Sequence, residues 1–91
     1  RYINVSGDIS LIKDIMEKFY GSSTIIDYLQ KVGFKVFQFI YHEGEMEILA
    51  GGDIEINPDT IMKEVKEIDK NCELAGWQKV EGRLGIGLVC H

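Results

Sequence analysis

The sequence predicts an α+β domain with the plan of a ferredoxin-like (split β-α-β) two-layer sandwich. The first observation is a set of segments in which apolar residues recur at every second position, as in strands. The second is a set of segments with apolar residues three or four apart, as in amphipathic helices. The third is their order: strand, helix, short helix, strand, strand, helix, strand. Right-handed crossovers and one hairpin convert this order into a mainly antiparallel sheet with an extra short helix after the first helix.

Composition limits the size and the class of the protein. A chain of 91 residues is expected to form one domain over residues 1–91, with a core modest enough that oligomerisation would help it. The residues are 45% hydrophobic and 27% charged, which is ordinary for a globular fold. No apolar run approaches the length of a membrane span, so we expect no membrane partner. The net charge of −5 repels phosphate backbones, so we expect no nucleic-acid partner either.

The first elements have clear boundaries. A short strand is expected over residues 2–5, and the turn Ser6-Gly7-Asp8 can cap the helix that follows. Gly21 and Gly33 each suit the left-handed conformation at the end of a helix. The two predicted helices contain the apolar residues Ile9, Ile12, Ile15, Met16 and Phe19 in the first, and Ile25, Ile26, Leu29 and Val32 in the second.

The next strand is apolar on both of its predicted faces. Alternation places Phe34, Val36 and Ile40 on one face, and a strand that is apolar on both faces must be covered on both. One face therefore suits the helices of the chain itself, and the other needs a second subunit, a protein partner or a ligand. The other face would present the aromatic residues Phe37, Phe39 and Tyr41.

A turn at residues 42–45 leads into the following strand. Gly51-Gly52 there permits either a tight turn or a kink in one long bent strand. Ile54 and Ile56 keep the parity of the apolar residues before the glycines, which favours the bent strand.

The last helix begins at Asn57-Pro58-Asp59, where a capping side chain, a proline at the first helical position and an acidic first turn coincide. We expect this helix to end near Asn71 and a final strand to run from Trp77 to the end, with the indole covering the core.

Glycines on the final strand suggest a contact surface. Gly85 and Gly87 share one face of that strand, and glycine inside a strand is costly unless something approaches closely. The approaching group is either a ligand or partner, or an aromatic side chain of a neighbouring strand. The interface hypothesis therefore comprises Phe37, Phe39, Tyr41, Gly85 and Gly87.

A small-molecule effector is possible at Ser6-Gly7-Asp8, which turns the chain between the first strand and the first helix. In element order and in this turn, the chain is similar to ACT domains, whose corresponding turn often contributes to effector binding. Ile9-Ser10 follows Asp8, where ACT domains usually have Pro-Gly. The resemblance implies an effector site at these three residues.

No motif predicts a catalytic site, a cofactor or a metal. His42 and His91 could converge with nearby carboxylates, and this defines the alternative of a small enzyme or metal-binding protein. Cys72 and Cys90 have no metal-ligand spacing, and we expect two reduced thiols in a cytoplasmic protein. The favoured function is a small non-catalytic, oligomerising domain with a regulatory, ligand-binding or assembly role. A second alternative is a subunit or adaptor of a larger complex.

Overall fold

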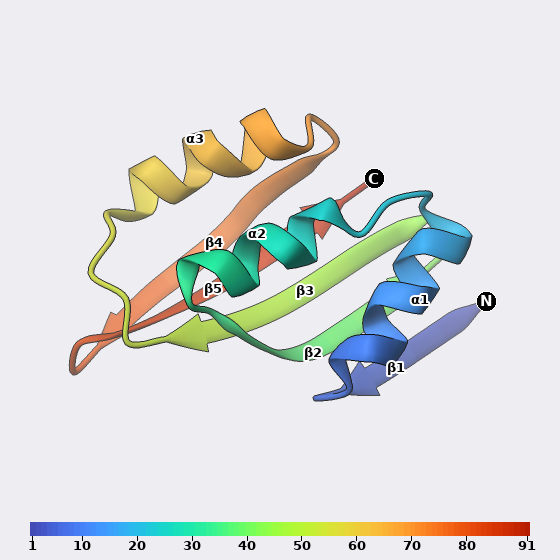
Figure 1. Ribbon diagram of the computed structural model, residues 1–91, viewed down its shortest axis with the longest axis horizontal. Coiled ribbons are helices and arrows are strands. Elements are labelled where there is room, and N and C mark those ends of the chain that lie inside the picture. The colour runs from blue at the N-terminus through green and yellow to red at the C-terminus, as the bar shows by residue number, and fades with distance from the viewer.

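The computed structural model describes all residues from Arg1 to His91. Three helices and five strands follow one another along the chain (Figure 1). Their bounds, in chain order, are β1 (Tyr2–Ser6), α1 (Ile9–Phe19), α2 (Thr24–Val32), β2 (Lys35–His42), β3 (Glu45–Gly52), α3 (Pro58–Ile68), β4 (Cys72–Val80) and β5 (Arg83–Cys90).

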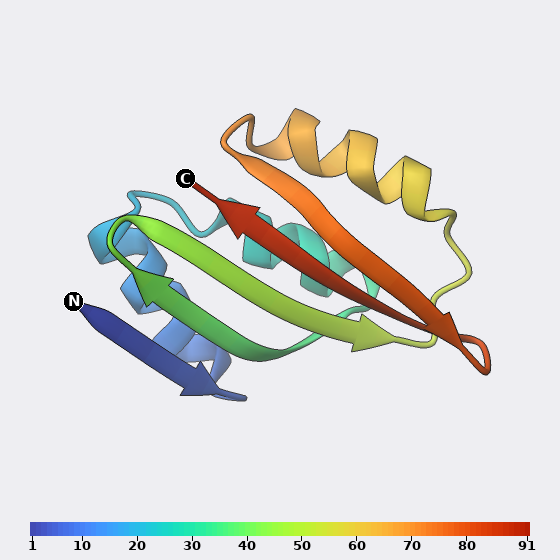
Figure 2. The ribbon, with the colours of Figure 1, turned by 180° about the vertical axis from the view of Figure 1, so that it is seen from behind.

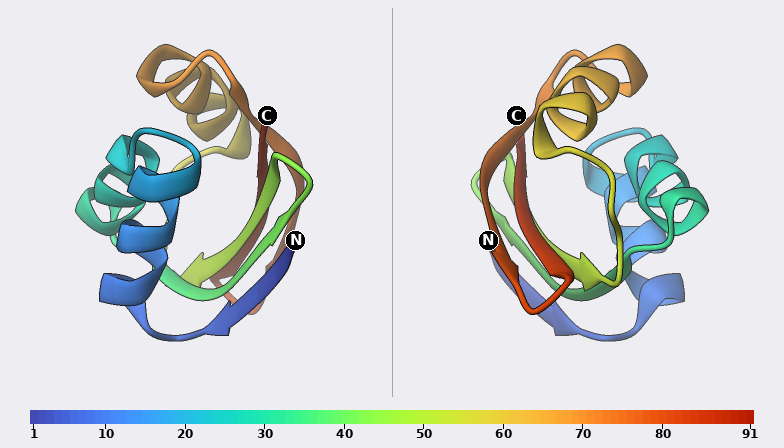
Figure 3. Two further views of the ribbon diagram at one scale, coloured as in Figure 1. Left: turned by 90° about the vertical axis from the view of Figure 1, so that its right-hand side faces the viewer. Right: turned by 90° about the vertical axis from the view of Figure 1, so that its left-hand side faces the viewer.

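The strands form one antiparallel sheet in the order β1-β2-β3-β5-β4. All three helices lie on the same side of this sheet, which curls around them (Figure 3). The opposite side, seen in Figure 2, is crossed by no helix. The prediction of an α+β fold with an antiparallel sheet is thus confirmed, and the sheet has one covered face and one open face.

The ferredoxin-like strand order is wrong. In that plan the first strand lies inside the sheet, whereas β1 here is an edge strand paired only with β2. The cause is the second helix, α2. Helix α1 returns the chain to the end of the sheet at which β1 begins, and α2 carries it to the end at which β1 finishes. β2 therefore runs antiparallel to β1 and can pair with it directly.

The prediction of one final strand from Trp77 to the end is wrong, because a turn divides this segment between two strands, β4 and β5. A separate strand β4 that starts at Cys72 was not predicted. Its last six residues are all exposed, so no alternation of apolar and polar residues marks it in the sequence. It joins β5 through a tight two-residue turn in which Glu81 and Gly82 both have positive φ. Such a turn matches the twist of an antiparallel pair, and glycine suits its second position.

The apparent two-sided strand at residues 34–41 results from a β-bulge. The pairing with β3 shifts between Val36 and Gln38, which leaves Phe37 as an extra residue. The bulge reverses the parity, so that Val36 and Phe39 both face the helices and are buried. Phe37, on the bulge, remains 48% exposed.

Gly51-Gly52 is neither a hairpin turn nor a kink inside a longer strand. Both residues belong to β3, which ends at Gly52, and residues 53–57 form the connection to α3. The prediction of one bent strand through Ile56 is therefore wrong. Ile54 is buried although it lies in this connection, so its apolar character reflects core packing rather than strand alternation.

The helix ends match the sequence signals closely. Asp8 accepts a hydrogen bond from the amide of Leu11, and Asn57 accepts one from the amide of Asp59. Gly33 ends α2 in the left-handed conformation. α3 ends at Ile68, slightly before the expected Asn71. The helices and the inner sheet face enclose one cluster of buried apolar residues.

Candidate functional site

The open face of the sheet contains a shallow hollow of about 340 Å³ near the end of the sheet formed by the β4–β5 turn. None of its lining residues is charged, in a chain in which 27% of residues are. Its large exposed side chain is that of Phe37 of β2, which is 48% exposed. Trp77 of β4 also lines the hollow and is 52% exposed, but it pairs with the buried Ile86, so its side chain points to the helix side of the sheet. The remaining lining residues are Ala50, Gly76, Gln78, Gly85, Ile86 and Gly87.

Glycine residues form much of the bottom of this hollow. Gly85 and Gly87 alternate along β5 with buried leucine and isoleucine, so they face away from the helices. Gly51 and Gly76 lie beside them on the neighbouring strands β3 and β4, paired with Gly85 and Gly87 respectively. Without side chains at these positions, the backbone itself forms part of the surface.

Three side chains approach the glycines from the same face, and one of them is Gln78, whose Cγ would lie 3.9 Å from a Cβ placed on Gly85. A Cβ placed on Gly51 would lie 3.6 Å from the Phe37 ring, and one placed on Gly87 would lie 3.4 Å from Cδ2 of Leu49. By contrast, a Cβ on Gly76 would have no atom within 4 Å. The phenyl ring and Leu49 therefore partly fill the inner part of the glycine surface, while the part on β4 stays open.

The structure brings together three of the five predicted interface residues. Phe37, Gly85 and Gly87 all line the hollow. Phe39 is fully buried under the helices, and the ring of Tyr41 stacks on that of Phe19 of α1, with 5.3 Å between ring centroids. These two belong to the covered face, because the bulge at Phe37 reverses the parity of β2 beyond it.

Sequence reasoning missed Gly76 and Gln78 as parts of this surface. Trp77, expected to cover the core, does point to the helix side of the sheet, but it is half exposed because β4 is an edge strand. The Glu81-Gly82 pair is the signal that could have revealed β4, since an acidic residue followed by glycine between two extended segments is compatible with a hairpin turn.

Ser6-Gly7-Asp8 forms the expected turn between β1 and α1. The Asp8 carboxylate caps α1, and the amide of Gly7 donates a hydrogen bond to the carbonyl oxygen of Phe37. Gly7 also lines a second hollow of about 390 Å³, together with residues at the end of α2 and the start of β2. The effector site at these three residues stays a prediction.

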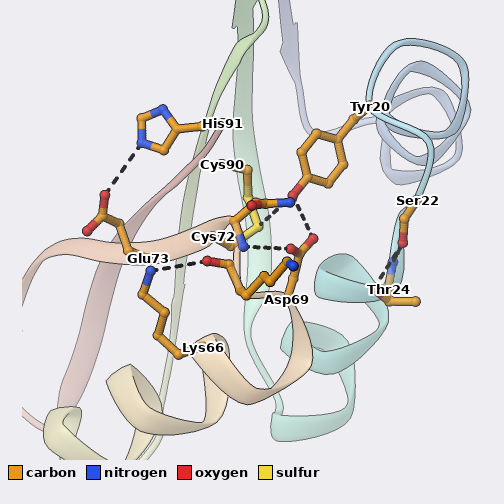
Figure 4. Close-up of a disulfide and its surroundings, with 11 residues drawn as sticks. Tyr20, Ser22, Thr24, Lys66, Asp69, Cys72, Glu73, Cys90 and His91 are labelled. Atoms are coloured by element: carbon orange, nitrogen blue, oxygen red, sulfur yellow. Dashed lines mark hydrogen bonds and ion pairs between the residues drawn. A yellow bond between two sulfur atoms is a disulfide. The ribbon is translucent and has the colours of Figure 1, made fainter.

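His42 and His91 lie at the opposite end of the sheet from the hollow. The His91 imidazole lies 3.2 Å from a carboxylate oxygen of Glu45 and 3.4 Å from one of Glu73, and Figure 4 shows the second contact. His42 lies 3.8 Å from Glu43. No group of three or more histidine, cysteine or acidic side chains is arranged to hold a metal ion.

Cys72 and Cys90 are directly opposite each other on β4 and β5 and form a disulfide (Figure 4). The expectation of two free thiols is therefore wrong. The two residues are separated by 18 positions in the sequence, and only the pairing of the unpredicted strand β4 brings them together. The argument for a cytoplasmic location rested on free thiols, and disulfides persist mainly in oxidising compartments. A cytoplasmic location thus stays a prediction that has lost its support.

The ionisable groups with shifted pKa values all lie away from the hollow. Burial, together with the hydrogen bond that Tyr20 donates to Asp69, raises the pKa of Tyr20 to about 12. Burial and the hydrogen bond to Glu64 also raise the pKa of Tyr28. The hydrogen bond from Lys13 to Asp27 raises the pKa of Lys13. These shifts belong to structural contacts on the helical side.

The chain was compared with family models, with curated proteins and with solved structures. No protein-family model, curated protein or solved structure matches the chain. No helix is long and apolar enough to cross a membrane.

Proposed function

We propose that this protein is a non-catalytic assembly domain that associates with a second copy of itself through the open face of its sheet. The observation that supports the proposal is the uncharged, glycine-rich hollow beside the half-exposed ring of Phe37, on a face that no helix covers. Aromatic residues are enriched in protein interfaces and charged residues are depleted at their centres. A contact that covers the hollow would remove the Phe37 ring from water.

The charges on the molecule are compatible with this arrangement. Arg83 pairs with Asp53 at one end of the sheet, and His91 contacts Glu45 and Glu73 at the other. These charged contacts are on opposite sides of the hollow along the strands, as in the polar rim of an interface. The uncharged middle is the part that a partner would bury.

Light scattering over a concentration series tests the proposal, with Phe37→Glu as the disrupting variant. A carboxylate at the hollow would be buried without a partner, so we expect the dissociation constant to rise at least about tenfold. Met62→Glu is the matched control, because Met62 is 44% exposed and lies on α3, on the other side of the sheet. Its dissociation constant should stay near that of the wild type.

Two results would contradict the proposal. The first is a wild-type protein that remains monomeric at the highest concentration reached. The second is an equal loss of association in Phe37→Glu and Met62→Glu, because that would indicate a general effect of added negative charge. Circular dichroism of each variant shows whether it is folded.

A further inference from the structure

The edge strand β4 has a row of backbone groups without partners. In a two-residue hairpin, the residues that flank the turn form a hydrogen-bonded pair, and the pairs alternate from there along the strands. Val80 and Arg83 flank the β4–β5 turn, so Lys79 and Trp77 direct their N–H and C=O groups away from β5. No hydrogen bond outside the sheet reaches the backbone of Lys79 or Trp77.

The same edge is exposed and partly apolar. From Ala75 to Val80 every residue of β4 is exposed, so neither face of this part of the strand is covered. Trp77 is 52% exposed and Val80 is 56% exposed. A long exposed edge with apolar side chains is a template for pairing with another strand. The other edge strand, β1, is shorter, with five residues against nine.

The open-face hollow extends to this edge. Its lining includes three consecutive residues of β4, namely Gly76, Trp77 and Gln78. A strand that pairs with β4 would therefore place side chains beside the hollow, because neighbouring strands lie only about 5 Å apart. The edge and the hollow are therefore adjacent, but Phe37 on β2 lies three strands from β4, about 14 Å away, so edge pairing and contact through the open face are separate parts of the association.

We infer that two copies of the chain join through antiparallel pairing of their β4 strands, which makes the two sheets continuous. This inference rests on the proposed self-association and specifies which strand mediates it. A second copy is the favoured occupant because β4 contains one acidic residue, Glu73, and one basic residue, Lys79. The strand has no net charge in a molecule of net charge −5, so two β4 strands meet without excess repulsion.

The symmetry of such a pair also limits the number of copies that can join. Antiparallel pairing of a strand with its own copy is an isologous contact, which uses both β4 edges and closes after two copies. Trp77 lies near the middle of β4, so a two-fold axis through the middle of the strand pair brings the two indoles close to each other. Trp77 is the only tryptophan in the chain, so the tryptophan fluorescence of the protein reports on the surroundings of this one side chain.

Lys79→Pro is the variant that tests the edge. Proline removes the outward N–H of residue 79 and leaves the bonds to β5 intact, as proline does in natural edge strands. Lys79→Thr is the matched control, because it removes the same charge and retains the N–H. One hydrogen bond is lost from each copy, so we expect Lys79→Pro to raise the dissociation constant at least about tenfold relative to Lys79→Thr.

The wild type supplies a second measurement that needs no variant. Hydrogen exchange by NMR is followed at low and high protein concentration, together with the emission of Trp77. We expect the amides of Trp77 and Lys79 to exchange more slowly, and the Trp77 emission to shift to shorter wavelength, as the concentration rises. This measurement tests the pairing of the β4 edges even when Lys79→Pro does not fold.

The outcomes separate this inference from the proposed function. A dimer that Phe37→Glu disrupts, but whose Trp77 and Lys79 amides exchange as in the monomer, overturns edge pairing and leaves association through the open face intact. A wild type that stays monomeric overturns both. Slow exchange at these amides with a selective loss in Lys79→Pro supports edge pairing, and it supports contact through the open face as well only when Phe37→Glu also weakens association.

Discussion

At the scale of single residues, Gly52 is the position where the fold least tolerates a side chain. It ends β3 and is buried against the end of α2. A Cβ there would lie 2.9 Å from the carbonyl oxygen of Gly33 and 3.1 Å from Cδ1 of Ile54. The nearest atom belongs to the backbone, so it cannot move away by changing a side-chain rotamer.

We expect Gly52→Ala to lower the free energy of unfolding by about 1–3 kcal/mol, the usual range for overpacking. Gly76→Ala is the control, because a Cβ at Gly76 has no atom within 4 Å, and its effect should stay within about 0.5 kcal/mol. Urea unfolding in the Phe37→Glu background measures both without interference from association. Equal effects of the two substitutions would show that the contact with Gly33 is not tight.

Because of Tyr20, we expect the stability of the protein to depend on pH in the alkaline range. Its hydroxyl donates a hydrogen bond to Oδ2 of Asp69 at 2.7 Å and lies 3.6 Å from Sγ of Cys72 (Figure 4). Burial and this hydrogen bond raise its pKa from 10 to about 12. The neutral phenol is therefore favoured by the folded state.

The sign of the effect follows from linkage. Between pH 10 and pH 12 the unfolded chain loses the Tyr20 proton before the folded protein does, so the free energy of unfolding falls with rising pH. The stabilisation is complete below pH 10 and is lost as the pH passes 12. Urea unfolding across this range should show a shallower decline in Tyr20→Phe than in the wild type. Some decline remains in the variant, because the pKa of Tyr28 is also raised. An unchanged slope would contradict the assignment to Tyr20.

At the scale of elements, the disulfide joins the first residue of β4 to the last residue of β5. β4 is an edge strand whose second half has no covering on either face, so this bond holds its buried half against the rest of the sheet. A disulfide that closes a loop of this size typically stabilises a protein by about 2–4 kcal/mol.

We therefore expect a dithiol reductant to lower the free energy of unfolding by about 2–4 kcal/mol. Hydrogen exchange should increase in β4 more than in β1 and β2. The control is the double variant Cys72→Ala/Cys90→Ala, whose stability should not respond to the reductant. A wild type whose stability is the same in both redox states would mean that hairpin pairing alone holds β4 in place.

Helix ends, strand faces and edge strands differ in how well they can be predicted from the sequence. Helix ends are predictable because capping depends on local residues, as at Asp8, Gly33 and Asn57. Strand faces are less predictable, since one extra residue at Phe37 reverses the parity of everything beyond it. An exposed edge strand such as β4 is hardest to predict, because neither face is required to be apolar.

At the scale of the whole molecule, the class of the fold follows from the sequence and the order of its strands does not. Period-two and helical segments imply a sheet with helices, and the structure has both. Strand order depends on how many times the chain reverses direction between strands, and α2 adds one such reversal. Only part of the candidate site could be predicted, because the other part depends on which strands lie next to each other. Phe37, Gly85 and Gly87 were recognised, whereas Gly76 and Gln78 depend on a strand whose pairing is not local.

The two chain ends lie at the same end of the sheet (Figures 1 and 2). Tyr2 pairs with His42 and Cys90 pairs with Met46, which places both ends beside the β2–β3 turn, whereas the hollow lies toward the β4–β5 turn. A fluorophore or affinity tag attached to either end would therefore project away from Trp77 and Lys79. The protein can be immobilised or labelled at its ends with the surface of interest left accessible.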